Sequence, residues 1–150
     1  NYHYHQITRY VLWKHENSLG LHNDRKVSPW EYLGLIGKSN MQSTLEHISA
    51  RNPRDAHNTE EFRSKYLNNI GNLAFMPKGM NSTLGNRSEL EKQPLLQASS
   101  YAAHREIADM ILTRGEWNEE SILARKGDII HFIIDRWQVK VSETTPVLVN

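Results

Sequence analysis

Residues 43–48 read Ser43-Thr44-Leu45-Glu46-His47-Ile48, a short β-prone run with an acid and a histidine side by side just before its last residue. Residues 71–76 read Gly71-Asn72-Leu73-Ala74-Phe75-Met76, in which apolar side chains recur at alternate positions. Both runs have the length and composition of short strands. A polar turn from Lys78 to Arg87 follows and leads into a helix-like segment that reaches Lys92. We therefore predict that residues 43–92 form the core around which the chain is organised.

Helical patterns occupy the rest of this central stretch. Between the strands, Asn58 with Glu61 three residues on indicates a helix start, and Phe62 and Tyr66 then recur at helical spacing. After the second strand, residues 84–92 are predicted to form a short helix that Pro94 brings to an end.

Longer helices are predicted outside the core, over about residues 7–19, 98–114 and 118–138. The last is the clearest, because Asn118 is suited to an N-cap and Trp117 can pack on Ile122 across it. We expect residues 1–6 to be a chain end, although His3 and His5 have the spacing of a chelating pair. Residues 27–36 are expected to be a connection with short extended structure, and residues 139–150 a frayed tail.

Length and composition indicate one domain. A chain of 150 residues with 38% hydrophobic content can bury roughly 68–70% of its unfolded surface. It contains no cysteine, which fits a reducing compartment and excludes a thiolate metal site or a cysteine nucleophile. No run approaches the length of a membrane-spanning helix. The first residue is Asn and not Met, so we expect the chain to be a fragment of a longer protein.

The acid–histidine pair and a later asparagine have the chemistry of a phosphodiesterase site. A neutral imidazole at His47 is suited to take a proton from an attacking water near pH 7. Glu46 offers a charged oxygen ligand to a hard divalent cation, and the side-chain carbonyl of Asn81 a neutral one. Such a cation stabilises the leaving oxygen. Neighbours on a regular strand face opposite ways, so Glu46 and His47 can share a site only where the strand ends or distorts.

Other polar residues of the central stretch are candidates for supporting roles. Asn72 is placed to hold the loop after His47 and to fix which imidazole nitrogen is free. Lys78, Arg87 and Lys92 lie close enough in sequence to contact phosphates. The net charge is only +1, so any polyanion must be bound through local clustering of charge. Arg125 is expected to be a structural ion-pair partner, with a DNA contact as the alternative, and His104 and His131 are expected to be surface or boundary residues.

These residues together resemble a known pattern. The runs Leu45-Glu46-His47-Ile48 and Ile70-Gly71-Asn72-Leu73, followed by Asn81, look like the HNH nuclease motif in its acid-His … Asn … Asn form. More specifically, the chain resembles the C-terminal nuclease domain of GmrSD-type modification-dependent restriction enzymes, and related proteins of phosphorothioate-sensing defence systems carry a similar domain. The resemblance covers roughly residues 10–137. Family members commonly have a proline shortly after the acid–histidine pair, where this chain has Ser49-Ala50.

The resemblance implies an α+β fold with a ββα-metal core, a short two-stranded antiparallel sheet plus a helix, embedded in a mainly helical domain. By match, His47 is the general base, Glu46 and Asn81 hold a divalent metal, Asn72 braces the loop, and Lys92 lies near the phosphates. The metal is expected to be Mg²⁺, with Mn²⁺ or another divalent ion as alternatives. The expected activity is DNA cleavage, one strand at a time, within an antiphage restriction system in the cytoplasm of a bacterium or archaeon.

The same resemblance implies partners and leaves rival functions open. DNA is the expected substrate, and an N-terminal sensor or NTPase-like domain of the same protein is the expected partner, with no membrane involved. A catalytically decayed domain that binds DNA or another protein would keep the same fold. An RNase or toxin with the same core is a third reading. Cleavage of a plasmid by wild type but not by site variants distinguishes the first reading from the second.

Overall fold

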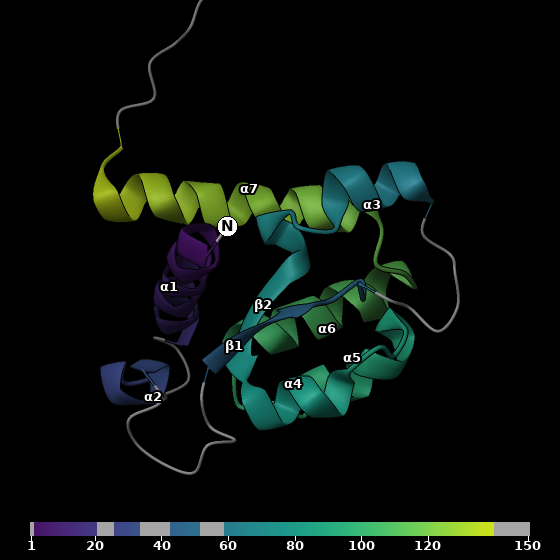
Figure 1. Ribbon diagram of the computed structural model, residues 1–150, viewed down its shortest axis with the longest axis horizontal. Coiled ribbons are helices and arrows are strands. Elements are labelled where there is room, and N and C mark those ends of the chain that lie inside the picture. The colour runs from purple at the N-terminus through teal and green to yellow at the C-terminus, as the bar shows by residue number, and fades with distance from the viewer. Residues whose placement is uncertain (1, 21–25, 34–42, 52–58, 140–150) are drawn as a thin grey trace, which may run out of the picture.

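The computed structural model describes residues 2–20, 26–33, 43–51 and 59–139 (Figure 1). Within these ranges the fold is α+β, mainly helical with one two-stranded sheet, as predicted. In chain order the elements are α1 (Tyr2–Leu19), α2 (Pro29–Leu33), β1 (Ser43–His47), α3 (Glu60–Tyr66), the 3₁₀ turn η3 (Ile70–Asn72), β2 (Leu73–Pro77), α4 (Lys78–Leu84), α5 (Glu89–Gln97), α6 (Ala102–Arg114) and α7 (Glu119–Trp137). No helix in the described ranges is both long and apolar enough to cross a membrane.

The two predicted strands pair as an antiparallel sheet. The register places Leu45 opposite Phe75 and His47 opposite Leu73. Because side chains alternate along a strand, β2 faces two different parts of the core. Ala74 and Met76 belong to one apolar cluster, and Leu73 and Phe75 to another. The sheet is therefore covered on both faces, which explains why the short strand β2 is almost wholly buried.

The helices around the sheet build these two clusters. The first cluster takes its buried side chains mainly from α5, α6 and the start of α7, among them Leu96, Ile107, Ile111 and Ile122. The second cluster is formed where α1, α2 and the middle of α7 meet the other face of β2. Figure 1 shows α7 lying across one end of the sheet, with α4, α5 and α6 grouped at its other side.

The closing helix begins as its sequence predicts. Asn118 is the N-cap of α7, and its side-chain oxygen accepts a hydrogen bond from the Ser121 backbone N–H at 3.1 Å. Trp117 and Ile122 are buried in the same cluster, in keeping with the predicted contact across the cap. Where α7 passes η3, a Cβ on Gly71 would lie 2.0 Å from the Ile122 carbonyl oxygen, so only glycine allows this close approach.

Several expected elements were wrong. α1 begins at Tyr2, so most of the predicted chain end is helical, and residues 29–33 form helix α2 instead of extended structure. The polar segment after β2 is helix α4, and the helix that follows begins at Glu89. Pro94 lies inside α5 instead of ending it. A proline removes one N–H bond, and water can satisfy the carbonyl of Leu90 because that residue is exposed.

Two residues also differ from their predicted environments. The N-cap of α3 is Thr59, whose hydroxyl accepts from the Phe62 N–H, while the predicted cap Asn58 lies outside the described residues. His104 was expected near the surface and is fully buried. Its two ring nitrogens lie 2.8 Å from the Phe75 carbonyl oxygen and 2.7 Å from the Ser99 hydroxyl, so the ring is paired at both nitrogens inside the core. The predicted tail beyond residue 139 lies outside the described ranges.

Candidate active site

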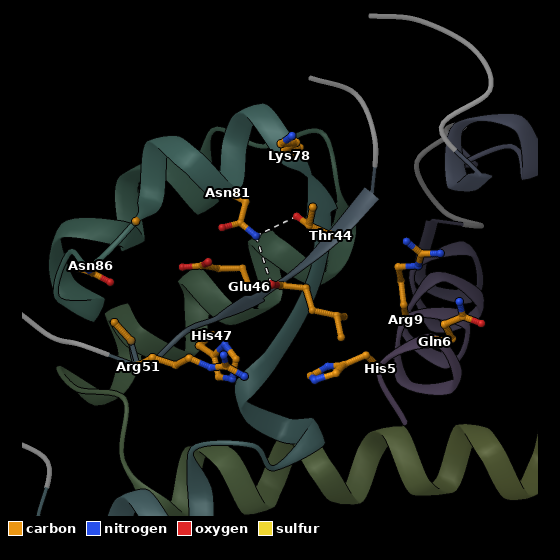
Figure 2. Close-up of a pocket in the computed structure, with 13 residues that line it drawn as sticks. His5, Gln6, Arg9, Thr44, Glu46, His47, Arg51, Lys78, Asn81 and Asn86 are labelled. Carbon is orange, nitrogen blue, oxygen red and sulfur yellow. Dashed lines mark hydrogen bonds between the residues drawn. The ribbon is translucent and has the colours of Figure 1, made fainter. Parts of the chain in front are cut away.

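A cavity of about 650 Å³ opens where β1, α4 and the start of α1 meet (Figure 2). Its lining comes from elements far apart in the sequence. The lining residues are His5, Gln6 and Arg9 of α1, Thr44, Leu45, Glu46 and His47 of β1, Ala50 and Arg51 after it, and Lys78, Asn81, Gly85 and Asn86 on and after α4. The cavity thus contains the predicted acid, the predicted histidine and the predicted asparagine.

Glu46 presents a buried carboxylate at this cavity. The residue is only 6% exposed. Its Oε1 atom lies 2.7 Å from the Nζ atom of Lys92. Burial raises the pKa of the Glu46 carboxyl above its ordinary value, while the Lys92 ammonium and the backbone N–H of His47 oppose that rise. The buried ammonium of Lys92, which belongs to α5, therefore holds this carboxylate in place.

That cation is the residue expected to contact phosphates. The Lys92 side chain has no exposed surface, because α5 directs it into the core. Besides Glu46, its Nζ atom donates to the carbonyl oxygens of His47 at 2.7 Å and Ile48 at 3.0 Å. An ammonium has three N–H donors, and protein oxygens take three bonds here. The nucleic-acid contact expected for Lys92 does not fit this burial, and the residue is a brace for the end of β1.

His47 occupies the last position of β1, where the strand ends and the loop begins. Neighbours on a regular strand face opposite ways, but His47 lies where the strand ends, and both Glu46 and His47 line the cavity. The imidazole Nε2 lies 3.1 Å from the side-chain oxygen of Asn68. Burial is the largest cause that lowers the pKa of His47, and the positive charges of Arg51, Lys92 and His5 lower it further, against the hydrogen bond from Asn68. A lowered pKa keeps this imidazole neutral near pH 7.

Asn72 lies directly behind the loop that follows His47. Its side chain is fully buried and makes four hydrogen bonds. The oxygen accepts from the Ser49 N–H at 2.8 Å and from the Trp117 indole N–H at 3.0 Å. The nitrogen donates to the carbonyl oxygens of Ser49 at 3.2 Å and Leu67 at 2.9 Å. These bonds hold the loop, as expected from the sequence, but the group that contacts the imidazole is Asn68.

Asn81 reaches the cavity from the first turn of α4. Its side-chain nitrogen donates to the Thr44 hydroxyl at 2.8 Å and to the Leu45 carbonyl oxygen at 3.1 Å (Figure 2). Since both donors point at β1, the amide is held in one orientation against the strand. The pair of bonds also ties α4 to the strand that carries Glu46 and His47.

The other basic residues considered from the sequence lie in different places. Lys78 lines the cavity and is exposed, so its charge faces solvent at the mouth. Arg87 is half-buried and is not among the residues that line the cavity. Arg125 was expected to pair with an acid. It is buried, and its Nη1 donates to the carbonyl oxygens of Ile70, Gly71 and Leu73 at 3.3, 2.8 and 2.7 Å.

Sequence reasoning missed part of this site. Asn68, Arg51 and the α1 residues His5, Gln6 and Arg9 were not assigned a role at it. A signal for α1 did exist, because residues four apart such as His5 and Arg9 share a face once the helix extends to Tyr2. No local signal marks Asn68, which precedes η3 by two residues and meets His47 only through the fold.

Comparison with known protein families shows to which family the chain belongs. The sequence profile of the family described as GmrSD restriction endonucleases, C-terminal domain, matches residues 1–132. The chain belongs to this family. No curated protein and no solved structure matched the chain. Membership of the GmrSD restriction endonuclease C-terminal domains makes this a nuclease domain of the restriction type, with DNA as its substrate. The matched range contains every described residue that lines the cavity.

The side chains that line the cavity can be compared with the ligands that different metals prefer. Among the described residues, no three His, Cys, Asp or Glu side chains are grouped to hold a metal ion. Zinc sites in proteins are usually built from such groups. Mg²⁺ differs, because it keeps several waters and takes only one or two protein carboxylates. A carboxylate from Glu46 and an amide oxygen from Asn81 fit a sparse, oxygen-only site of that kind.

Proposed function

We propose that this chain is a metal-dependent DNA endonuclease of the HNH type, in which His47 is the general base. The proposal is carried by one observation: Glu46, His47 and Asn81, which come from a strand and from a helix, line the same cavity. Family membership supports nuclease activity in general, and the order acid-His … Asn … Asn supports the HNH assignment.

The proton acceptor follows from the contacts of the imidazole. When Nε2–H donates to the Asn68 oxygen, the lone pair of His47 is on Nδ1. A neutral ring with a free Nδ1 is able to take a proton from a water molecule that attacks phosphorus. Asn68 is a positioning residue in this scheme, since it fixes the tautomer. Asn72 does not contact the imidazole, and it acts by holding the loop after His47 through the Ser49 backbone.

Glu46 and Asn81 are the residues that would hold a divalent cation, Mg²⁺ before Mn²⁺. Lys92 contacts Oε1 of Glu46, so the other carboxylate oxygen is the one we assign as ligand. The Asn81 amide nitrogen is occupied by Thr44 and Leu45, which assigns its oxygen to the cavity. When bound, such a cation supplies a Lewis acid for the leaving oxygen. Lys78 at the mouth of the cavity is proposed to contact phosphate, and Arg87 to contact DNA farther from it.

A single site of this kind addresses one phosphodiester, so we expect nicking of one strand at a time. We further propose that the domain acts in antiphage restriction, with recognition of modified DNA supplied by an N-terminal sensor or NTPase-like domain of the same protein. An RNA substrate is tested beside DNA, because the same chemistry can cleave either backbone.

The test is nicking of supercoiled plasmid in Mg²⁺ or Mn²⁺. We expect His47→Ala to lower the rate roughly 10²- to 10⁴-fold, the usual effect of losing a general base. Asn81→Ala is expected to raise the metal concentration needed for half-maximal rate, and EDTA to abolish nicking. His131→Ala is the matched control, since it removes an exposed imidazole of α7 outside the cavity.

Two results would contradict this function. If wild type, His47→Ala and Asn81→Ala leave plasmid equally intact in the presence of either metal, the domain binds without cleaving. If His47→Ala nicks at the wild-type rate, the base is another group. Thermal unfolding of each variant shows whether a lost rate comes from lost structure.

A further inference from the structure

The wall of the cavity contributed by α1 has no part in the mechanism above. His5, Gln6 and Arg9 lie at positions i, i+1 and i+4 of the helix, so His5 and Arg9 share one face. All three line the same cavity as His47. Figure 2 shows them across the cavity from Arg51 and Asn86. A substrate strand in this cavity would therefore pass between β1 and α1.

Arg9 is held against an aromatic platform. Its guanidinium carbon lies 5.0 Å from the centre of the Tyr32 ring. Tyr32 in turn stacks on Trp13, with ring centres 4.4 Å apart and planes 14° apart. Trp13 is buried and its indole N–H donates to the Val27 carbonyl oxygen at 2.8 Å, which fixes the base of the stack. A guanidinium over an aromatic ring combines a cation–π contact with N–H donors in a fixed fork. This arrangement lowers the conformational entropy that Arg9 loses on binding an anion.

The charges around the cavity favour a polyanion. Among the described residues that line it, three carry a cationic side chain, Arg9, Arg51 and Lys78, and one carries a carboxylate, Glu46. The whole chain has 18 basic and 17 acidic residues, so positive charge is concentrated here relative to the rest of the protein. Charge of one sign lining a hollow attracts ligands of the opposite sign and raises their local concentration.

We propose that α1 is a substrate-binding wall of the site, in which Arg9 binds a phosphate of the DNA strand and Gln6 and His5 lie along its path. This inference rests on the nuclease function proposed above. A guanidinium contacts phosphate through two parallel N–H bonds, which explains why an arginine placed over the Tyr32 ring suits the position. The wall comes from an element remote in sequence from the strand that carries Glu46 and His47.

The experiment measures DNA binding without cleavage. In a His47→Ala parent, the affinity for a short DNA duplex is measured by fluorescence anisotropy at several salt concentrations with Mg²⁺ present. Arg9→Ala is expected to weaken binding roughly tenfold, as for loss of one charged hydrogen-bonded contact. The slope of log affinity against log salt should fall by about 0.9, the value for one phosphate contact. Arg9→Lys should bind DNA with an affinity between those of the parent and of Arg9→Ala, because lysine keeps the charge and loses the planar fork.

Two further variants separate binding from folding and from total charge. Arg114→Ala removes one exposed arginine at the end of α6, away from the cavity, and should leave affinity and slope unchanged. Gln6→Glu introduces a negative charge at an exposed position of the wall and should weaken binding without altering the melting temperature. If Arg9→Ala fails to fold, Gln6→Glu decides the question.

The inference is overturned if Arg9→Ala and Gln6→Glu bind DNA as the parent does, with an unchanged salt slope. It is also overturned if the parent shows no binding at low salt. Because the parent cannot use His47, these readings do not depend on cleavage. A wild-type protein that binds through Arg9 but never nicks plasmid would refute the proposed nuclease mechanism and leave the α1 wall in place.

Discussion

Two buried cations hold the same end of the sheet from different helices. Lys92 of α5 donates to Glu46 and to the carbonyl oxygens of His47 and Ile48, where β1 ends. Arg125 of α7 donates to carbonyl oxygens of η3 and of the first residue of β2. The register pairs His47 with Leu73, so the two sets of hydrogen bonds lie on neighbouring strands at the same end of the sheet.

The difference between them lies in what they hold. Arg125 donates to main-chain oxygens, and its burial lowers its pKa to about 10, which leaves it charged at neutral pH. Lys92 also contacts the Glu46 carboxylate, and that acid lines the cavity. Two braces of similar burial thus have unequal consequences for the site. We expect loss of Arg125 to affect stability, and loss of Lys92 to affect both stability and catalysis.

The largest expected effect is that of Lys92→Met. It leaves the Glu46 carboxylate and two carbonyls buried without their donor, and breaking a buried pair in this way costs about 3–5 kcal/mol. Arg125→Met removes three bonds to carbonyls and should cost about 3 kcal/mol. Urea unfolding measures both free energies. Nicking per folded molecule should fall at least tenfold in Lys92→Met and stay within a few-fold of wild type in Arg125→Met.

A double variant sharpens this contrast. Lys92→Met combined with Glu46→Gln should be more stable than Lys92→Met alone, because no uncompensated buried carboxylate remains. No such rescue is expected for Arg125→Met from any one substitution of the carbonyls it binds, since these belong to the main chain. Equal loss of nicking in the two single variants would contradict the distinction between the braces.

What the sequence could predict was local. The two strands follow from composition and alternation, and the Asn118 cap from residue type and position. The grouping of Glu46, His47 and Asn81 followed from the order of a motif, and the cavity contains all three. Each of these signals lies within a few residues of the chain or within a recognised pattern.

What could not be predicted depends on the fold. Lys92 was predicted at the phosphates from its position in the chain and from the resemblance, and a lysine is rarely buried; only the direction of α5 shows that this one is. Asn68 acquires its contact with His47 because η3 returns the chain to β1. Arg9 reaches the cavity because α1 packs beside the sheet, and it is held there by Tyr32 of α2, a helix that was expected to be extended.

A third buried side chain, His104, also holds the sheet. It is held in its neutral form, so its contribution to the free energy of unfolding depends on pH. His104 of α6 donates from Nε2 to the Phe75 carbonyl and accepts at Nδ1 from the Ser99 hydroxyl. Burial lowers the pKa of His104 to about 4. Between pH 4 and the ordinary value of 6.5, the unfolded chain therefore binds more protons at this site than the folded protein. Stability from His104 is complete above pH 6.5 and is lost as the pH falls toward 4, by roughly 3 kcal/mol in all.

His104→Gln tests that sign. The variant should be less stable than wild type at pH 7.5, and the difference should shrink as the pH falls from 6.5 to 4, because glutamine does not titrate. Urea unfolding at a series of pH values measures the difference. His15, whose pKa burial also lowers to about 4, is present in both proteins, so its contribution cancels. A constant difference over this range would mean that His104 is not held neutral.

The smallest expected effects come from the N-caps of the two helices that carry the cationic braces. Ser88 caps α5 in a capping box with Glu91, and Asn118 caps α7 through Ser121. Ser88→Ala and Asn118→Ala should each cost about 1 kcal/mol, and the corresponding glycine variants only a few tenths. Neither cap touches the cavity, so nicking per folded molecule should be unchanged in both. If Ser88→Ala lowers nicking as much as Lys92→Met, the position of α5 as a whole, and not the ammonium that it carries, sets the geometry of Glu46.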